Sequence, residues 1–194
     1  MAKFGCGKIV AVGASTGGIG ALEQLFSQLP LQIPPILLVV HLPAGFTRLY
    51  AGRLSASHGY DFKEAETGDE VVRGRVLIAP AGKHMTVKQV GSRLFAECFV
   101  GEKVQYVIPS ADVLFESVAD TAGEEAVGVI LTGMGADGAR GLKKMRESGA
   151  RTIGQDRETS AVYGMPKVAY EIGAVELVLP LDKIAEKIAS LSNQ

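Results

Sequence analysis

Six short runs of apolar, mostly β-branched residues recur along this chain, and they constrain its fold more than any other feature. The runs do not alternate with polar residues, which is typical of strands buried on both faces of a parallel sheet. Segments with apolar residues every three or four positions lie between them and predict amphipathic helices. The runs are residues 9–12, 36–40, 76–79, 127–131, 151–154 and 175–179. This alternation predicts an α/β fold, a doubly wound and mostly parallel sheet flanked by helices, with right-handed crossovers.

One region departs from this alternation and predicts a small antiparallel element. Residues 70–107 hold several short β-like pieces, of which 86–90 and 93–99 flank Gly91-Ser92. A glycine-containing pair between two strand-like runs is typical of a hairpin turn. We therefore expect an antiparallel hairpin near residues 84–99, added to the mostly parallel sheet.

Local signals also indicate where some helices begin and which side they bury. Ser110 follows a proline, as does Asp182, and a short polar side chain in such a place is typical of a helix N-cap. One predicted helix has apolar residues at spacings of three and four, and we expect them to face the core together. They are Phe46, Leu49, Tyr50 and Leu54.

The composition indicates one globular domain over residues 1–194. A chain of 194 residues of which 47% are hydrophobic can bury one substantial core. Its 20 basic and 21 acidic residues are spread along the chain and leave a net charge of −1, which gives no sign of nucleic-acid or membrane binding. Nothing in the sequence calls for an oligomer, so we expect a monomer.

The sequence also carries no targeting signal. The longest apolar run, residues 33–40, contains two prolines and is too short to span a bilayer. The N-terminus lacks the apolar core of a signal peptide. Cys6 and Cys98 are far apart and have no metal-ligand spacing, so they are expected to be reduced thiols. These features predict a soluble, cytoplasmic protein.

A serine between glycines is the candidate nucleophile. The stretch VGASTGG, residues 12–18, follows the first predicted strand and precedes a helical segment. In a G-x-S-x-G turn the glycines let the backbone fold sharply, so that the hydroxyl of Ser15 stands clear of the sheet. The N–H groups at the start of the helix can stabilise a developing negative charge. Ser15 could equally be an ordinary helix N-cap.

The same stretch could instead hold a dinucleotide. Residues 13–20 approach the glycine-rich turn of short-chain dehydrogenases, and Tyr163 and Lys167 have the spacing of that family's catalytic pair. Three observations weigh against this interpretation. The glycine run is one residue too long, Pro166 lies where the pair would need a helix interior, and no acidic residue follows the second strand to hold a ribose.

His41 and Asp137 are the residues expected to complete a catalytic site with Ser15. All three follow predicted strands, and reactive groups of open α/β sheets gather beyond the carboxyl ends of strands. An imidazole can take the serine proton near neutral pH, and a carboxylate fixes the tautomer of that imidazole. Spacing alone leaves other candidates open. They are the rival base His84, the more solvated His58, and the weaker carboxylates Asp112, Asp120 and Asp156.

Six ordered blocks, spread between Val10 and about Leu181, give the chain a family resemblance. The blocks are VGASTGG (12–18), HLPAGFT (41–47), APAGKHM (79–85), PSADVLF (109–115), LTGMGADG (131–138) and YGMPK (163–167). The chain resembles the catalytic domain of the CheB chemotaxis methylesterases, the protein-glutamate methylesterases. In this resemblance Tyr163 and Lys167 belong to a family block and are not a dehydrogenase pair.

The resemblance implies a serine hydrolase of bacterial chemotaxis adaptation. Such an enzyme removes methyl groups from methylated glutamates on the cytoplasmic helices of chemoreceptors and releases methanol, and some members also deamidate glutamines. The resemblance implies Ser15 as the nucleophile, His41 as the general base and Asp137 as the carboxylate that orients it. It also implies the backbone N–H groups of Thr16 and Met134 as oxyanion donors, with no metal or other cofactor.

The chain differs from the family pattern in three places. Family members usually carry an N-terminal receiver domain and a linker, so this chain is expected to be a stand-alone enzyme or the catalytic domain of a longer protein. Tyr106-Val107-Ile108 stands where the family commonly has His-Arg, so substrate contacts in that loop are expected to differ. Leu42 replaces a common methionine, a near-isosteric change. His84 matches a family position outside the triad, which favours His41 as the base.

Overall fold

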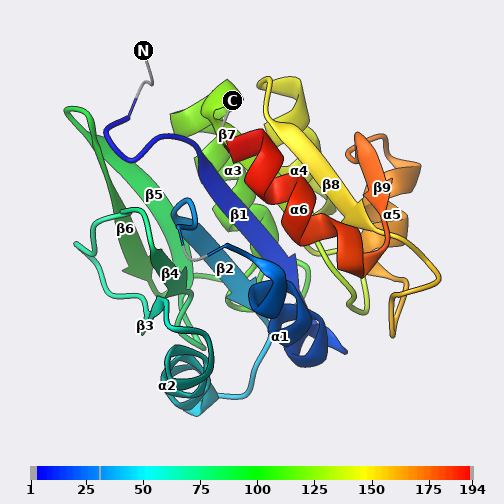
Figure 1. The fold of residues 1–194 in the computed structure, drawn as a ribbon, viewed down its shortest axis with the longest axis horizontal. Helices are drawn as coiled ribbons and strands as arrows, with labels where there is room; N and C mark the ends of the chain where they lie inside the picture. Colours follow the sequence, from blue (N-terminus) through cyan, green and yellow to red (C-terminus); the bar gives the residue numbers. More distant parts are fainter. Residues whose placement is uncertain (1–3, 31, 193–194) are drawn as a thin grey trace.

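A parallel sheet forms the centre of the molecule (Figure 1). Its strands are β1 (Ile9–Ala14), β2 (Ile36–Val40), β3 (Asp61–Glu64), β4 (Arg75–Ile78), β7 (Ala126–Ile130), β8 (Arg151–Gln155) and β9 (Leu177–Leu179). The computed structural model describes residues 4–30 and 32–192. Within them the sheet is seven-stranded with the order β3-β4-β2-β1-β7-β8-β9, and all neighbouring strands run parallel.

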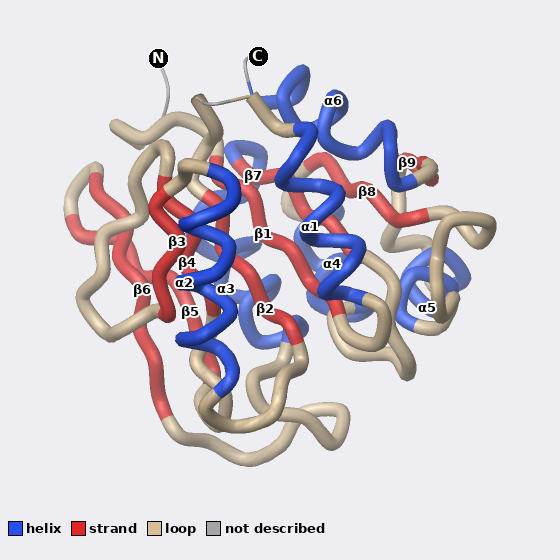
Figure 2. Tube along the Cα trace, turned by 60° about the horizontal axis from the view of Figure 1, so that its bottom comes forward, coloured by secondary structure: helices blue, strands red, loops and turns tan. Residues whose placement is uncertain are grey.

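Helices cover both faces of this sheet, because its central strands are apolar on both sides. The helices are α1 (Gly18–Gln28), α2 (Phe46–His58), α3 (Ala111–Ala122), α4 (Ala139–Glu147), α5 (Met165–Glu171) and α6 (Leu181–Ser192), with a 3-10 turn at Gly123–Glu125. Figure 2 shows α1, α2 and α6 on one face, and α3, α4 and α5 lie on the other. The predicted class, a doubly wound parallel α/β sheet, is confirmed. None of the described helices has the length and apolar character needed to cross a bilayer.

Side chains along the central strand β1 point alternately into two hydrophobic cores, one on each face of the sheet. Val10 and Val12 pack under α1 and α6, whereas Ile9 and Ala11 pack under α3. All four side chains are fully buried. This two-sided burial explains why the strand shows no polar alternation in the sequence.

The predicted hairpin is present and packs on the α3 side of the molecule. It consists of β5 (His84–Val90) and β6 (Arg93–Phe99), which pair antiparallel across Gly91-Ser92 with Val90 opposite Arg93. Gly91 has φ of 62°, a backbone conformation that glycine adopts without steric cost. Buried Val87 and Leu94 join the same core as α3, so the hairpin extends that core beyond the sheet.

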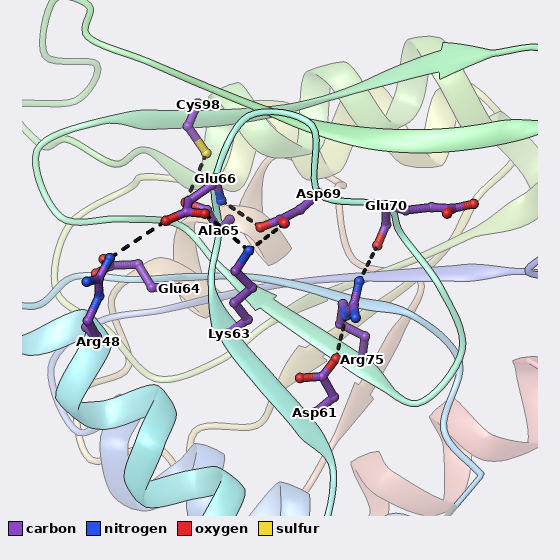
Figure 3. Close-up of polar contacts among 10 residues, drawn as sticks. All are labelled: Arg48, Asp61, Lys63, Glu64, Ala65, Glu66, Asp69, Glu70, Arg75 and Cys98. Carbon is purple, nitrogen blue, oxygen red and sulfur yellow. Dashed lines mark hydrogen bonds and ion pairs between the residues drawn. The ribbon is translucent and has the colours of Figure 1, made fainter.

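The edge strand β3 lies outside the predicted elements, because only Phe62 of its four residues is buried. Charged side chains hold it in place instead (Figure 3). Arg75 Nε donates to Asp61 Oδ2 over 2.6 Å, joining β3 to its neighbour β4. Lys63 Nζ donates to Asp69 Oδ1 over 2.6 Å, which ties the strand to the loop that follows it. Charges of this kind on an edge strand discourage pairing with another chain.

Both cysteines are free thiols in the structure. Cys98 Sγ contacts the carbonyl of Ala65 over 3.5 Å (Figure 3), and burial raises the pKa of this thiol to about 11. Burial also raises the pKa of the Cys6 thiol. Both groups are therefore protonated near neutral pH.

Two local predictions were wrong. In α2 the buried residues are Thr47, Tyr50, Ala51 and Leu54, whereas Phe46 and Leu49 are exposed by 57% and 71%. Positions 47, 50, 51 and 54 already form a complete helical face, and the remaining two apolar residues fall on the solvent side of it. Asp182 is not an N-cap, because α6 begins one residue earlier and includes it in the first turn, where its charge favours the helix dipole.

Candidate active site

Ser15 lies immediately after β1, in the tight turn that leads into α1. Its backbone N–H donates to the carbonyl of Thr132 over 3.0 Å, and its own carbonyl accepts the N–H of Gly18 over 2.7 Å. Gly17 has φ of 80°, and a Cβ there would lie 2.6 Å from the Cβ of Ala161. The turn therefore requires glycine for both conformation and space, and it leaves the Ser15 hydroxyl at the carboxyl end of the sheet.

His41 follows β2 and contacts two other candidate residues at once. Its Nδ1 lies 3.0 Å from Ser15 Oγ, and its Nε2 lies 2.9 Å from Asp137 Oδ2. Since an ionised carboxylate can only accept hydrogen bonds, Nε2 carries the proton in this arrangement. Nδ1 is then the acceptor for the Ser15 hydroxyl, which is the tautomer that a general base needs.

Asp137 lies in the loop between β7 and α4 and is only 2% exposed. Its Oδ2 accepts from His41 and from the N–H of Ala111 over 2.7 Å. Its Oδ1 accepts from Ser110 Oγ over 2.5 Å and from the N–H of Asp112 over 3.2 Å. Burial alone would raise the pKa of this carboxyl, but the hydrogen bonds, with those of His41 and Ser110 foremost, outweigh it and lower the pKa. The carboxylate is therefore ionised at neutral pH.

The expected oxyanion donors, the N–H groups of Thr16 and Met134, belong to residues that follow Ser15 and its close neighbour Gly133 in the chain. Thr16 is the next residue, and Met134 follows Gly133, whose Cα lies so near Ser15 that an added Cβ would be 2.8 Å from the serine Cβ. Within residues 4–30 and 32–192, neither the Thr16 nor the Met134 amide donates to a protein acceptor. The Met134 side chain is 75% exposed. Both N–H groups therefore meet one requirement of an oxyanion donor, which is an N–H not already used by a protein acceptor.

The rival base His84 does not bond to Ser15, because both of its ring nitrogens have other partners. It is 2% exposed, its Nδ1 accepts the N–H of Ser110 over 3.2 Å, and its Nε2 donates to the carbonyl of Glu102 over 2.9 Å. Both ring nitrogens are therefore occupied by backbone groups. His58 packs its ring against Phe26 at the far end of α2.

The weaker carboxylate candidates have structural partners. Asp112 accepts the N–H of Gly141 over 2.8 Å, Asp120 pairs with Lys144 over 2.6 Å, and Asp156 accepts the N–H of Thr159 over 2.9 Å. The structure thus brings together Ser15, His41 and Asp137 from the set of candidates. None of the other candidates contacts the Ser15 hydroxyl among the described residues.

Sequence reasoning missed two hydroxyl groups at this site. Ser110 has a predicted role only as a helix cap, yet its hydroxyl donates to Asp137. The Thr132 hydroxyl accepts the N–H of Val162 over 2.9 Å and donates to the carbonyl of Thr16 over 3.0 Å. It thereby links the Ser15 turn to a distant loop. Neither contact has a signal in sequence spacing, because each joins loops far apart along the chain.

The structure does not form the dehydrogenase pair. Tyr163 precedes α5, and Pro166 occupies the first turn of that helix, where proline is tolerated. Lys167 pairs with Glu171 over 3.7 Å on the exposed side of α5. The described residues also contain no group of three or more His, Cys, Asp or Glu side chains placed to hold a metal ion.

Comparison with known proteins identifies the family of this chain. The family model described as CheB methylesterase matches residues 10–188. This chain belongs to the CheB methylesterase family. The catalytic domain of Thermotoga maritima CheB methylesterase has a crystal structure that is 40% identical, with a TM-score of 0.92 over 95% of this chain and 98% of that one.

Curated CheB relatives extend well beyond the matched segment. A protein-glutamate methylesterase/protein-glutamine glutaminase of Syntrophomonas wolfei is 52% identical over 188 residues, which are 97% of this chain and 55% of the relative. A protein of the same name from Sulfurimonas denitrificans is 51% identical over 187 residues, 96% of this chain and 53% of the relative. The chain thus spans about half the length of these relatives.

Proposed function

We propose that this CheB family member is a serine hydrolase that demethylates glutamate methyl esters on chemoreceptors and releases methanol. The observation that carries the proposal is the continuous hydrogen-bonded path from the Ser15 hydroxyl through His41 to the buried Asp137 carboxylate. A binding module would not need all three groups in one path, whereas acyl transfer does. The reaction needs no metal or other cofactor.

The acylation step uses each of these groups once. Ser15 Oγ attacks the ester carbonyl carbon while its proton moves to Nδ1 of His41. The carbonyl oxygen becomes an oxyanion, which the N–H groups of Thr16 and Met134 stabilise; one such donor is typically worth ~10²–10³ in rate. Asp137 stabilises the imidazolium of His41 through Nε2 without taking its proton. Collapse of the intermediate expels methoxide, which leaves as methanol with the proton from His41.

The second half of the reaction repeats the same steps with water. His41 takes a proton from a water molecule, whose oxygen attacks the acyl carbon held on Ser15. The oxyanion forms again beside the same two N–H groups, and Ser15 leaves with the proton that His41 returns. Glutamate is the product. A glutamine side chain in place of the ester would lose ammonia by the same route, in keeping with the second half of the relatives' name.

Family membership supports the substrate that we propose, and the setting is part of the same proposal. The substrate is a methylated cytoplasmic helix of a chemoreceptor, and the enzyme acts as a monomer in the cytoplasm during chemotaxis adaptation. The chain forms one catalytic domain, and its longer relatives carry a receiver domain beside it. The catalytic groups lie at the carboxyl edge of the sheet, where a protein substrate can approach from solvent.

Methanol release from methylated receptor tests the proposal. Wild type is compared with Ser15→Ala, and Ser27→Ala serves as the control because Ser27 is an exposed serine whose hydroxyl donates to the carbonyl of Gln24 within α1. We expect release by wild type and by the control but none above background by Ser15→Ala. Equal release by wild type and Ser15→Ala would mean that Ser15 is not the nucleophile. Receptor binding without release by any variant would favour a non-catalytic binding module.

A further inference from the structure

Ser110 occupies the N-cap position of α3 without capping that helix. A serine at this position ordinarily accepts an N–H of the first turn through its side chain, but Ser110 makes no such bond. Its hydroxyl instead donates to Asp137, and the N–H groups of Ala111 and Asp112 donate to Asp137 as well. The carboxylate of the β7–α4 loop is therefore the cap of α3, and the serine hydroxyl is left to bind it.

We propose that Ser110 is a positioning residue for the reaction, acting on His41 through the Asp137 carboxylate. This inference rests on the proposed function. By holding Oδ1, the hydroxyl fixes the rotation of the carboxylate so that Oδ2 faces Nε2 of His41. Ser110 itself touches neither the substrate nor the reacting atoms.

The four donors around Asp137 are unequal, and this gives Ser110 its role. Oδ2 is held between His41 Nε2 at 2.9 Å and the Ala111 N–H at 2.7 Å. Oδ1 has the Ser110 hydroxyl at 2.5 Å but the Asp112 N–H only at 3.2 Å. A hydroxyl bound to a carboxylate makes a short and strong hydrogen bond. Without it, Oδ1 would keep only the long contact with the Asp112 N–H, and the carboxylate would be held mainly through Oδ2.

His84 in turn fixes Ser110. The N–H of Ser110 donates to Nδ1 of His84, whose Nε2–H donates to the carbonyl of Glu102. Ser110 is fully buried, and the His84 ring packs against Phe99 with 5.6 Å between ring centroids. His84, the alternative base considered from the sequence, thus holds the backbone of Ser110 in position.

The charged and titratable surroundings of Asp137 decide the direction of the pH effect. His41 faces it from the loop after β2, Asp112 lies beside it on α3 with Arg140 of α4 as partner, and His84 lies behind Ser110. Removing the Ser110 hydroxyl leaves less of the Asp137 charge neutralised. The less neutralised carboxylate favours a positive charge beside it, which sets the direction of the effect on the pH–rate profile.

The test compares Ser110→Ala and Ser110→Thr with wild type in methanol release from methylated receptor over a range of pH. For Ser110→Ala we expect kcat to fall about tenfold with KM unchanged, as for loss of one hydrogen bond to a charged group. The acid limb of the pH–rate profile should move to higher pH. Ser110→Thr keeps the hydroxyl on extended backbone, which threonine favours, and should restore both the rate and the profile.

A second readout does not depend on turnover. The chain has three histidines, so the ring N–H proton that His41 shares with Asp137 can be assigned by NMR with His41→Gln as reference. This resonance should shift in Ser110→Ala and return in Ser110→Thr. Absence of methanol release by wild type would contradict the proposed function. The His41 resonance would still show whether Ser110 positions Asp137.

Ser117→Ala is the matched control for a merely structural effect. Ser117 lies on the same helix, and its hydroxyl accepts the N–H of Val87 and donates to the carbonyl of Leu114, away from Asp137. This variant should lower thermal stability but leave the pH–rate profile and the His41 resonance unchanged. An unchanged profile and resonance in Ser110→Ala, or the same shifts in Ser117→Ala, would overturn the positioning role.

Discussion

At the level of single residues, the environments of His41 and His84 differ in what the ring nitrogens contact. Both nitrogens of His41 contact side chains that can exchange or stabilise a proton, Ser15 and Asp137. Both nitrogens of His84 contact backbone groups, the N–H of Ser110 and the carbonyl of Glu102. A base must have a lone pair free to face its proton donor, and only His41 meets that condition.

Alanine at each of the two histidines therefore gives opposite results. His41→Ala should remove most of the catalysis, ~10⁶-fold by analogy with loss of the catalytic histidine in another serine hydrolase. His84→Ala should keep turnover within a few-fold of wild type but lower the free energy of unfolding by about 1–3 kcal/mol, since the buried N–H of Ser110 loses its partner. Methanol release and urea unfolding on both variants check this. An equal loss of activity in His84→Ala would contradict the assignment of His41 as the general base.

At the level of secondary structure elements, the sequence was most informative where burial is two-sided. The central strands of the sheet were predicted because both of their faces are covered and therefore apolar; in β1, for example, Val10 lies in one core and Ala11 in the other. The edge strand β3 was missed because charged pairs, and not apolar contacts, hold most of it. Prediction from apolar pattern thus fails where the sheet meets solvent.

The candidate site was also predicted only in part from the sequence. Ser15, His41 and Asp137 were predicted to lie together because each follows a strand of one parallel sheet, and the carboxyl ends of such strands share an edge. The bond from Ser110 to Asp137 joins the start of α3 to the loop before α4. Its formation depends on the packing of these two elements, which no local pattern in the sequence encodes.

The β7–α4 loop offers a prediction at this scale. In Gly133→Ala the new Cβ would overlap the Met165 sulfur and lie 2.8 Å from the Ser15 Cβ. The loop would have to move away from Ser15 and carry the Met134 N–H with it, which should lower kcat by ~10²–10³ as for loss of one oxyanion donor. Steady-state kinetics on methylated receptor measures the loss.

Gly20→Ala is the control for that substitution. Gly20 lies in α1, is exposed, and has open space around an added Cβ. Alanine there should leave kcat unchanged and stabilise the fold by roughly 0.5–1 kcal/mol, because it favours the helix. Equal kinetics for Gly133→Ala and Gly20→Ala would contradict the assigned position of the oxyanion loop.

At the level of the whole molecule, the proposed catalysis and the stability of the fold depend on the same contact. The N-terminus of α3 meets the β7–α4 loop and the start of α4 through two buried carboxylates, Asp137 and Asp112. Asp137 makes the hydrogen bond to His41 on which the proposed catalysis depends, and it also caps α3. Asp112 holds the N–H of Gly141 at the start of α4. The site is therefore part of the interface that holds one face of the molecule together.

The two carboxylates should give stability opposite dependences on pH. Hydrogen bonds lower the folded-state pKa of Asp137 despite its burial, so its contribution is present above the unfolded value of about 3.9 and is lost as pH falls through the folded value. Burial raises the folded-state pKa of Asp112, so its contribution is present at low pH and is lost as pH rises through that value.

Urea unfolding at a series of pH values, on wild type, Asp137→Asn and Asp112→Asn, separates these contributions. The stability advantage of wild type over Asp137→Asn should shrink as the solution is acidified below about pH 4, the unfolded aspartate value. The difference between wild type and Asp112→Asn should change in wild type's favour at higher pH, while the solution is acidified through the raised folded-state pKa of Asp112 toward about pH 4, because the neutral carboxyl is the form that burial prefers. If both differences moved in the same direction with pH, the two carboxylates would not have the opposite environments that the structure gives them.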